Sequence, residues 1–293
     1  MISVIGGQSQ LALAMKWAIS DKRFNYFNSS EVNILDEISV RSFIKDVKPN
    51  LIINCSAYTD VNRAEEESEN CFMLNLKGLV NLVNACEGYN SHIVFISTDY
   101  VFDGSKSSPY NEYDDTYPLN IYGSSKRDAE KFLINNCTNY TILRTSWLYS
   151  GFKKNFLKTI FLAALGKESL NVQSRERGTP TDAIELAYAI EKLSNNLQFA
   201  KSKTFHFSGN YCVSWNQFAN DIVSVAFELG LLRDKLEVKD NINNNVSTSM
   251  ALRPMYSALD SSKFTSTFGF QHATYKNCIK RSLELIAKEI KLL

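Results

Sequence analysis

The sequence predicts an α/β protein, because short apolar runs alternate with longer stretches of helical periodicity through its first half. A second observation is that the first run, which ends at Ile5, leads through a glycine turn directly into a helical stretch. A third is that this rhythm is lost after about Tyr149. We therefore expect a Rossmann-like, doubly wound parallel sheet followed by a smaller mixed substrate-binding lobe.

The expected strands are short, apolar or aromatic, and bounded by polar residues, proline or glycine. They lie at residues 2–5, 24–27, 51–54, 93–97 and 140–143. Between them, apolar residues recur every three or four positions, which predicts helices. These helices are expected at residues 10–19, 38–47, 71–87, 122–136 and 155–165.

The second half is less regular. A Thr-Pro-Thr turn at 179–181 leads into a helix that is expected to begin at Thr181, and one more strand is expected at 204–207. An Asn-rich stretch at 240–245 predicts a solvated loop, and helices are expected at 218–229 and 279–290. We divide the chain into a dinucleotide-binding lobe, 1–149 with return elements near 181–210, and a mainly substrate-binding lobe, 150–293.

The composition argues against several classes of function. The 293 residues carry 32 Lys and Arg against 31 Asp and Glu, so there is no broad basic field for a nucleic-acid polymer or an anionic membrane. No apolar run approaches the ~18–20 residues of a membrane span, and the first residues contain no basic leader, so we expect a cytoplasmic protein. The six cysteines and three histidines lack metal-ligand spacing, and no metal site is expected.

The turn Gly6-Gly7-Gln8-Ser9-Gln10-Leu11 joins the first expected strand to the first expected helix. Backbone amides in that position can hold a pyrophosphate. Ser9 and Ala12 stand where a complete G-x-x-G-x-x-G pattern has glycine, although both are small enough for close backbone approach. This turn alone supports dinucleotide binding and a simple tight turn about equally.

A tyrosine four residues before a lysine can place a phenol and an ammonium on one helical face, where the cation would lower the tyrosine pKa. Such a pair can protonate a carbonyl near neutral pH. Context favours the pair Tyr122/Lys126, because it follows a strand that ends in Ser97-Thr98. The Thr98 hydroxyl could polarise the same carbonyl that the tyrosine protonates. About one pair is expected by chance, and the sequence contains three: Tyr122/Lys126, which is the favoured pair, Tyr149/Lys153 and Tyr188/Lys192.

Several longer motifs occur in order along the chain. They are Ser97-Thr-Asp-Tyr-Val-Phe-Asp-Gly104, Pro118-Leu-Asn-Ile-Tyr-Gly-Ser-Ser-Lys126, Arg144-Thr-Ser-Trp-Leu-Tyr149, Gly178-Thr-Pro-Thr181 and Arg253-Pro254. Together they closely resemble the dTDP-4-dehydrorhamnose reductases, a family of extended short-chain dehydrogenases/reductases. The resemblance runs nearly from end to end, which makes it more specific than any single motif.

The resemblance implies reduction of the 4-keto group of a dTDP-6-deoxyhexulose, dTDP-4-dehydro-L-rhamnose, to dTDP-L-rhamnose in sugar-nucleotide synthesis for surface polysaccharides. NADPH or NADH would be the cofactor, and the protein could be a homodimer. In this family Tyr122 would be the general acid, Lys126 would hold the nicotinamide ribose and lower the tyrosine pKa, and Thr98 would bond the carbonyl. Matching cofactor contacts are Gly6, Ser9, Gln10, Leu11, Ile34, Ser56, Ala57, Tyr58, Tyr122 and Lys126. Matching sugar-nucleotide contacts are Asp99, Tyr100, Trp147, Asn155 and Arg253.

Departures from the family pattern keep alternatives open. Asn33 replaces a common aspartate, which, like Ser9 and Ala12, weakens the case for cofactor binding. Arg175-Glu176 replaces Asp-Gln before the Gly-x-Pro-Thr turn, so the substrate could be another deoxyhexulose. Residues 28–31 offer neither a clear acid for the ribose nor an arginine for a 2′-phosphate, so NADH and NADPH both remain candidates. The other hypotheses are an epimerase or dehydratase of the same fold and a non-catalytic regulatory subunit. Apart from the resemblance, Tyr100 and Trp147 are typical of packing aromatics.

Overall fold

The computed structural model describes residues 1–241 and 251–292. Its centre is a six-stranded parallel sheet with the order β10-β5-β4-β3-β1-β2. Its strands are β1 (Ile2–Ile5), β2 (Phe24–Phe27), β3 (Leu51–Asn54), β4 (His92–Thr98), β5 (Tyr140–Thr145) and β10 (Lys203–His206). The chain first extends the sheet from β1 to β2 and then returns to the other side of β1 with β3. In open parallel sheets, ligands bind at such a switch point, beyond the carboxyl ends of the strands.

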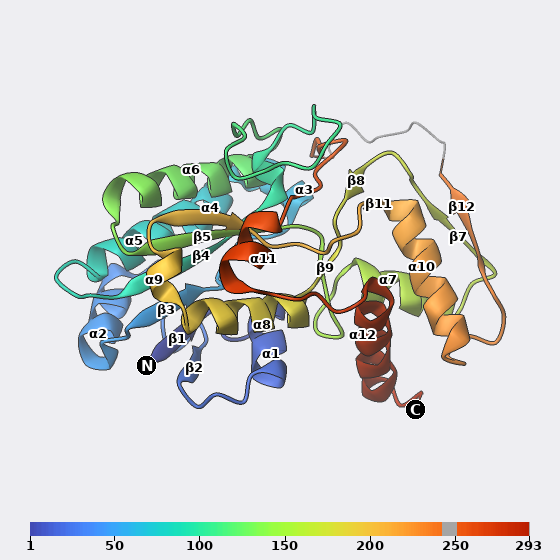
Figure 1. Cartoon of the computed structure of the whole chain (residues 1–293), viewed down its shortest axis with the longest axis horizontal. Helices are drawn as coiled ribbons and strands as arrows, with labels where there is room; N and C mark the ends of the chain where they lie inside the picture. Colours follow the sequence, from blue (N-terminus) through green and yellow to red (C-terminus); the bar gives the residue numbers. More distant parts are fainter. Residues whose placement is uncertain (242–250, 293) are drawn as a thin grey trace.

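Helices cover both faces of this sheet, because successive strand residues point to opposite faces and both sets are apolar (Figure 1). Val4 and Ile53 face one core, whereas Ile5 and Ile52 face the other. The first face carries α1 (Gln10–Ala18), α8 (Ala183–Ser194), α9 (Leu197–Ala200) and α11 (Ser262–Phe268). The second carries α2 (Glu37–Val47), α5 (Gly78–Ala85) and α6 (Ile121–Asn136). The predicted doubly wound, Rossmann-like sheet is therefore confirmed.

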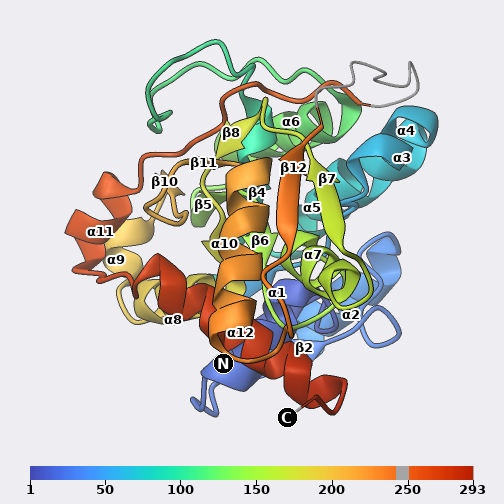
Figure 2. The ribbon, with the colours of Figure 1, turned by 90° about the vertical axis from the view of Figure 1, so that its right-hand side faces the viewer.

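A separate core lies beside the sheet, where three helices pack against a small parallel strand pair (Figure 2). The helices are α7 (Phe156–Ala164), α10 (Trp215–Glu228) and α12 (Tyr275–Glu289), and the strands are β7 (Ser169–Val172) and β12 (Glu237–Asp240). Large apolar side chains such as Phe161, Phe218 and Ile279 are fully buried there. This mixed lobe faces the carboxyl ends of the central strands.

Two short strand pairs connect the parts of the molecule. They are β6 (Leu148–Tyr149) with β9 (Thr181–Asp182), and β8 (Arg177–Gly178) with β11 (Val213–Ser214). The remaining elements, α3 (Val61–Glu66), α4 (Ser68–Phe72), the π-helical η1 (Met73–Lys77) and the 3₁₀ turn η2 (Asp99–Val101), lie in the connections after β3 and β4. Through β9, α8 and β10, residues from the second half of the chain rejoin the central sheet.

Most expected elements are present, with three differences. The helix expected at 71–87 is divided into α4, η1 and α5 by a π-helical turn. The helix expected from Thr181 begins at Ala183, because Thr181 pairs in β9 and the Asp182 carboxylate caps the helix by accepting the Ile184 amide at 2.8 Å. The loop expected at 240–245 begins with the last residue of β12, and its residues from 242 onward lie outside the described part of the chain.

The helices that the structure describes include none that is both long and apolar enough to cross a membrane.

Candidate active site

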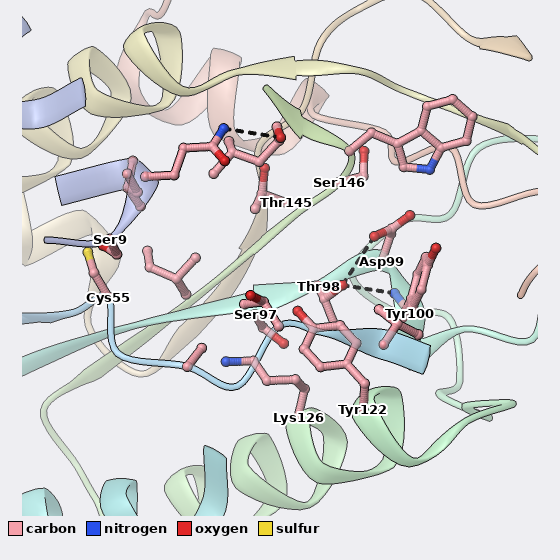
Figure 3. A pocket seen from close by; sticks show the side chains of 18 of the residues that line it. Ser9, Cys55, Ser97, Thr98, Asp99, Tyr100, Tyr122, Lys126, Thr145 and Ser146 are labelled. Atoms are coloured by element: carbon pink, nitrogen blue, oxygen red, sulfur yellow. Dashed lines mark hydrogen bonds between the residues drawn. The ribbon is translucent and has the colours of Figure 1, made fainter. Parts of the chain in front are cut away.

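A cavity of about 540 Å³ opens beyond the carboxyl ends of β1, β3, β4 and β5 (Figure 3). Side chains from at least six separate segments line it, which is the usual construction of a site at the switch point of a parallel sheet. The lining residues are Gln8, Ser9, Gln10, Leu11, Asn54, Cys55, Ala57, Thr59, Val61, Ile96, Ser97, Thr98, Asp99, Tyr100, Tyr122, Lys126, Thr145, Ser146, Trp147, Leu148, Lys153, Lys154 and Trp215.

Tyr122, Lys126 and Thr98 meet in this cavity, as Figure 3 shows. Thr98 is the last residue of β4, and the other two lie one turn apart on α6. The helix starts where it does because the Asn120 side chain caps it, accepting the Gly123 amide at 2.7 Å. The structure thus brings together a phenol, an amine and an alcohol that are well separated in the sequence.

Gly123 lets the first turn of α6 approach the end of β4. A Cβ atom built on it would lie 2.1 Å from the Tyr100 carbonyl oxygen and 2.9 Å from the Pro118 side chain. Both distances are shorter than real contacts, so any side chain here would push the helix away from the strand end. The close approach places the Tyr122 side chain beside Thr98, at the end of β4.

Burial controls the protonation of the Tyr122/Lys126 pair. It raises the pKa of Tyr122 well above its usual value, and the hydrogen bond with Thr98 offsets only part of this shift. It also lowers the pKa of Lys126 to about 7, although the charge of Glu130 acts in the opposite direction. Desolvation of the phenolate therefore dominates the pKa of Tyr122, and the expected lowering of this pKa by Lys126 stays a prediction.

A buried ion pair supports the face of α6 that carries Lys126. One turn after Lys126, the Glu130 carboxylate accepts two hydrogen bonds from Arg144 of β5, at 3.0 and 2.7 Å. It also accepts a short hydrogen bond from the hydroxyl of Ser97, the residue before Thr98. The pair therefore ties the helix of Tyr122 and Lys126 to the two strands that end at the cavity.

Asp99 brings a buried carboxyl group to the same cavity. Burial raises its pKa to about 7, although hydrogen bonds from Ser257 and Thr98 favour the charged form. Its Oδ2 atom is buried and has no hydrogen-bond partner among the described residues. The neighbouring ring of Tyr100 packs edge-on against Tyr122, with 5.9 Å between ring centroids. The site thus holds a second group that can carry a proton near neutral pH.

The turn after β1 has the form of a phosphate-binding turn. Gly6 has a φ of +80°, and a Cβ atom on it would lie 2.7 Å from the Ser56 amide nitrogen, so only glycine fits. Ser9 caps α1 by accepting the Ala12 amide at 3.3 Å, and the Gln10 amide side chain donates to the Leu148 carbonyl at 3.2 Å. The amino end of α1 consequently faces the cavity.

The π-helical turn η1 fixes the strand-end segment opposite α6. Its Asn75 is 2% exposed, accepts the Tyr58 amide at 2.8 Å and donates to the Tyr58 carbonyl at 3.1 Å. The same amide group donates to the Ser125 hydroxyl on α6 at 2.9 Å. The segment that contains Ser56 and Ala57 is thereby held at a fixed distance from the helix of Tyr122 and Lys126. π-Helical turns occur frequently at functional sites.

Two tryptophans form a wall of the cavity. Trp147 stacks on Trp215 of α10, with ring centroids 3.4 Å apart and planes inclined by 2°. Trp147 has a φ of +43°, a left-handed conformation that costs energy for a residue with a side chain. Gly178 packs against its ring, where a Cβ atom would lie 2.5 Å away. The aromatic wall therefore joins the segment after β5 to the smaller lobe.

No group of three or more His, Cys, Asp or Glu side chains that could hold a metal ion occurs within 1–241 and 251–292. The six cysteines are free, and four of them are buried.

Comparison with known proteins agrees with this geometry. Residues 1–288 match the family model described as the RmlD substrate binding domain. The chain is 34% identical to the dTDP-4-dehydrorhamnose reductase of Aggregatibacter actinomycetemcomitans over 285 residues, which cover 96% of each chain. This chain belongs to the dTDP-4-dehydrorhamnose reductase family. The family and fold expected from the sequence motifs are thus confirmed.

Further members of the family support this result. The dTDP-4-dehydrorhamnose reductase of Sinorhizobium fredii is 33% identical, with 96% of this chain and 95% of that protein covered. The crystal structure of the Bacillus anthracis dTDP-4-dehydrorhamnose reductase in complex with NADP superposes with a TM-score of 0.87. It is 28% identical and covers 97% of this chain and 98% of its own.

Of the site residues expected from resemblance to the family, ten line the cavity: Ser9, Gln10, Leu11, Ala57, Thr98, Asp99, Tyr100, Tyr122, Lys126 and Trp147. Gly6 and Ser56 lie directly behind this lining, in contact with each other. Ile34, Tyr58, Asn155 and Arg253 do not line it.

The four residues outside the lining have other contacts. Ile34 is buried against Gly78, and the Tyr58 hydroxyl donates to Glu67 at 2.9 Å. Asn155 caps α7 by accepting the Lys158 amide at 3.1 Å, and its contact with the substrate stays a prediction. Arg253 donates to Asn62 at 3.3 Å, and its charge acts on Tyr100, so it lies near the cavity.

Sequence reasoning missed several residues that shape the site. Glu130, Asn75 and Lys154 carry no motif of their own and are identified only when the helices and strands are assembled. Trp215 lies in the segment Ser214-Trp215, which is also similar to the family, but its stack on Trp147 joins residues from different lobes. In the less favoured pair Tyr149/Lys153, Lys153 lines the cavity, whereas Tyr149 is buried in the core of the smaller lobe.

Proposed function

We propose that this protein reduces the 4-keto group of dTDP-4-dehydro-L-rhamnose to give dTDP-L-rhamnose, with NADPH or NADH as the reductant. The observation that carries the proposal is the convergence of Tyr122, Lys126 and Thr98 in a cavity that also receives the amino end of α1. Membership of the family supports the choice of reaction and substrate. We further propose that the sheet-containing lobe binds the dinucleotide, that the smaller lobe holds the sugar nucleotide, and that the enzyme acts in the cytoplasm.

The chain's own residues fit a nicotinamide dinucleotide. The cradle formed by Gly6 against Ser56 would be filled by any side chain, and it leaves room for a diphosphate at the amino end of α1. Ser9, Gln10, Leu11 and Ala57 would flank the bound molecule, and Lys126 would bond the ribose next to the nicotinamide. When bound, the reduced nicotinamide supplies a hydride.

Tyr122 would donate the proton that the reduced carbonyl oxygen requires. Its raised pKa keeps the phenol protonated at neutral pH, so the proton is present before the reaction begins. The Thr98 hydroxyl lies beside the phenol in the cavity and would stabilise the developing negative charge on the substrate oxygen. Burial lowers the pKa of Lys126 to about 7. Bound phosphates or a forming phenolate would stabilise its ammonium form, so Lys126 would then be fully charged.

The sugar nucleotide would lie between η2 and the aromatic wall. Asp99, with its unpaired Oδ2, and Tyr100 are available at the end of β4 to contact the hexulose, and Trp147 offers an apolar face on the opposite side. Arg253 lies close to Tyr100, and its buried Nε atom has no partner within 1–241 and 251–292, so a modest movement would bring its guanidinium to the ligand.

The test follows loss of NADPH or NADH absorbance after addition of dTDP-4-dehydro-L-rhamnose to the purified protein. Tyr122→Phe should lower kcat by roughly 10²–10⁴-fold, the usual contribution of a general acid. Tyr188→Phe is the matched control, because Tyr188 belongs to a pair of the same spacing on α8, outside the cavity. No turnover by the unmodified protein with either cofactor, or full activity of Tyr122→Phe, would refute the proposal.

A further inference from the structure

The cavity has a second positive patch that the proposed mechanism does not use. Among the lining residues that the structure describes, three are cations: Lys126, Lys153 and Lys154. Lys126 is buried beside Tyr122, whereas the other two are exposed in the segment between β6 and α7. Neither of these two forms an ion pair with a carboxylate of the described residues, although other surface lysines, such as Lys158, do.

The backbone that carries this patch is held in a defined shape. Lys153 has a φ of +56°, a left-handed conformation that is unfavourable for lysine. It is maintained by Asn155, whose side-chain amide donates to the carbonyls of Ser150, Phe152 and Lys153 at 2.8, 3.2 and 3.4 Å. A strained conformation that surrounding hydrogen bonds enforce at the edge of a cavity suggests a functional requirement.

On the basis of the proposed function, we propose that Lys153 and Lys154 form an anion subsite that binds the diphosphate of the sugar nucleotide. Two diphosphate esters must share this cavity, one in the cofactor and one in the substrate. The cofactor's diphosphate has its own partner in the amino end of α1, and Lys126 is taken by the tyrosine and ribose. The Lys153–Lys154 patch is therefore the remaining positive group among the lining residues.

The position of the patch agrees with a substrate diphosphate. Lys153 and Lys154 share the cavity edge with Trp147 and Trp215, the aromatic wall on the side of the smaller lobe. Directly after the patch, α7 begins, and its amino end adds partial positive charge. In this arrangement Asn155 is a positioning residue, since it fixes the lysine backbone without lining the cavity.

The test compares the double variant Lys153→Met/Lys154→Met with a control, Lys22→Met/Lys167→Met, that loses the same charge at exposed sites outside the cavity. Calorimetric titrations with dTDP and, separately, with NADPH measure both affinities. We expect the Kd for dTDP to rise at least about tenfold in the first variant, with a weaker dependence on salt. The Kd for NADPH should stay within about twofold, and the control should bind both ligands normally.

Lys153→Gly separates charge from conformation. Glycine adopts a positive φ freely, so this variant should keep its melting temperature while it binds dTDP more weakly. Unchanged dTDP affinity in the double variant, or loss of NADPH affinity alone, would overturn the proposal. The result differs if the proposed function is wrong but the anion subsite is right. The unmodified protein would then show no turnover, while its affinity for dTDP would still depend on Lys153 and Lys154.

Discussion

Replacing Arg144 with methionine removes the cation from the buried ion pair that supports α6. The Arg144 and Glu130 side chains are 7% and 3% exposed and share two hydrogen bonds. In Arg144→Met the Glu130 carboxylate keeps the Ser97 hydroxyl as a partner but loses its compensating charge. An uncompensated buried charge of this kind costs about 3–5 kcal/mol, so we expect the free energy of unfolding to fall by that amount.

Urea unfolding at neutral pH, followed by circular dichroism, measures this loss. The double variant Glu130→Leu/Arg144→Met removes both charges, and because apolar replacement of a buried pair is often close to neutral, it should recover most of the stability. The two single losses should therefore be strongly non-additive. A double variant that loses the sum of the single-variant values, or an Arg144→Met loss below about 1 kcal/mol, would refute this account of the pair.

Three further predictions concern the site. Gly123→Ala should lower kcat at least about tenfold and cost about 1–3 kcal/mol of stability, because its Cβ atom would lie 2.1 Å from the Tyr100 carbonyl oxygen. A normal kcat in turnover assays would show instead that α6 can move without disturbing the reaction. The buried Asp99 carboxyl has a pKa of about 7, whereas in the unfolded chain it titrates near 3.8, so the unmodified protein should lose stability as the pH rises from about 4 to about 7. The Asp99→Asn variant lacks this carboxyl, so its stability relative to the unmodified protein should increase over the same range. A difference in urea midpoint that does not vary with pH would contradict the raised pKa. Asn155→Ala should lower the free energy of unfolding by about 1 kcal/mol through loss of the α7 cap. It should also raise KM for the sugar nucleotide with little change in kcat. An altered kcat with a normal KM would show that Asn155 acts in the reaction itself.

The central sheet was predictable because most of its strands are short apolar or aromatic runs with clear boundaries, as in Leu51–Asn54. The small strands were missed because their residues lack such a pattern: β12, for example, is Glu-Val-Lys-Asp and pairs with β7 only after the smaller lobe has assembled. The break in the helix expected at 71–87 was also invisible, because the π-helical turn is stabilised by contacts of Asn75 with Tyr58 and Ser125 rather than by a helix-breaking residue.

At the site, sequence context selected Tyr122/Lys126 correctly as the pair that meets Thr98, because a strand end and a following helix define their positions. Burial raises the pKa of Tyr122, and this effect could not be predicted because the degree of burial cannot be read from spacing. Glu130 and Arg144 lie 14 residues apart and act through a contact between helix and strand. Such contacts depend on how the elements pack, and a single sequence gives no local signal for them.

The stacked tryptophans have a practical consequence. The protein has three tryptophans, and two of them, Trp147 and Trp215, form the stack at the cavity, whereas Trp17 is half exposed on α1. Two of the three tryptophans thus form a built-in optical reporter between the segment after β5 and the smaller lobe. Any ligand that separates or covers these indoles should change the emission spectrum, so occupancy can be followed without a label.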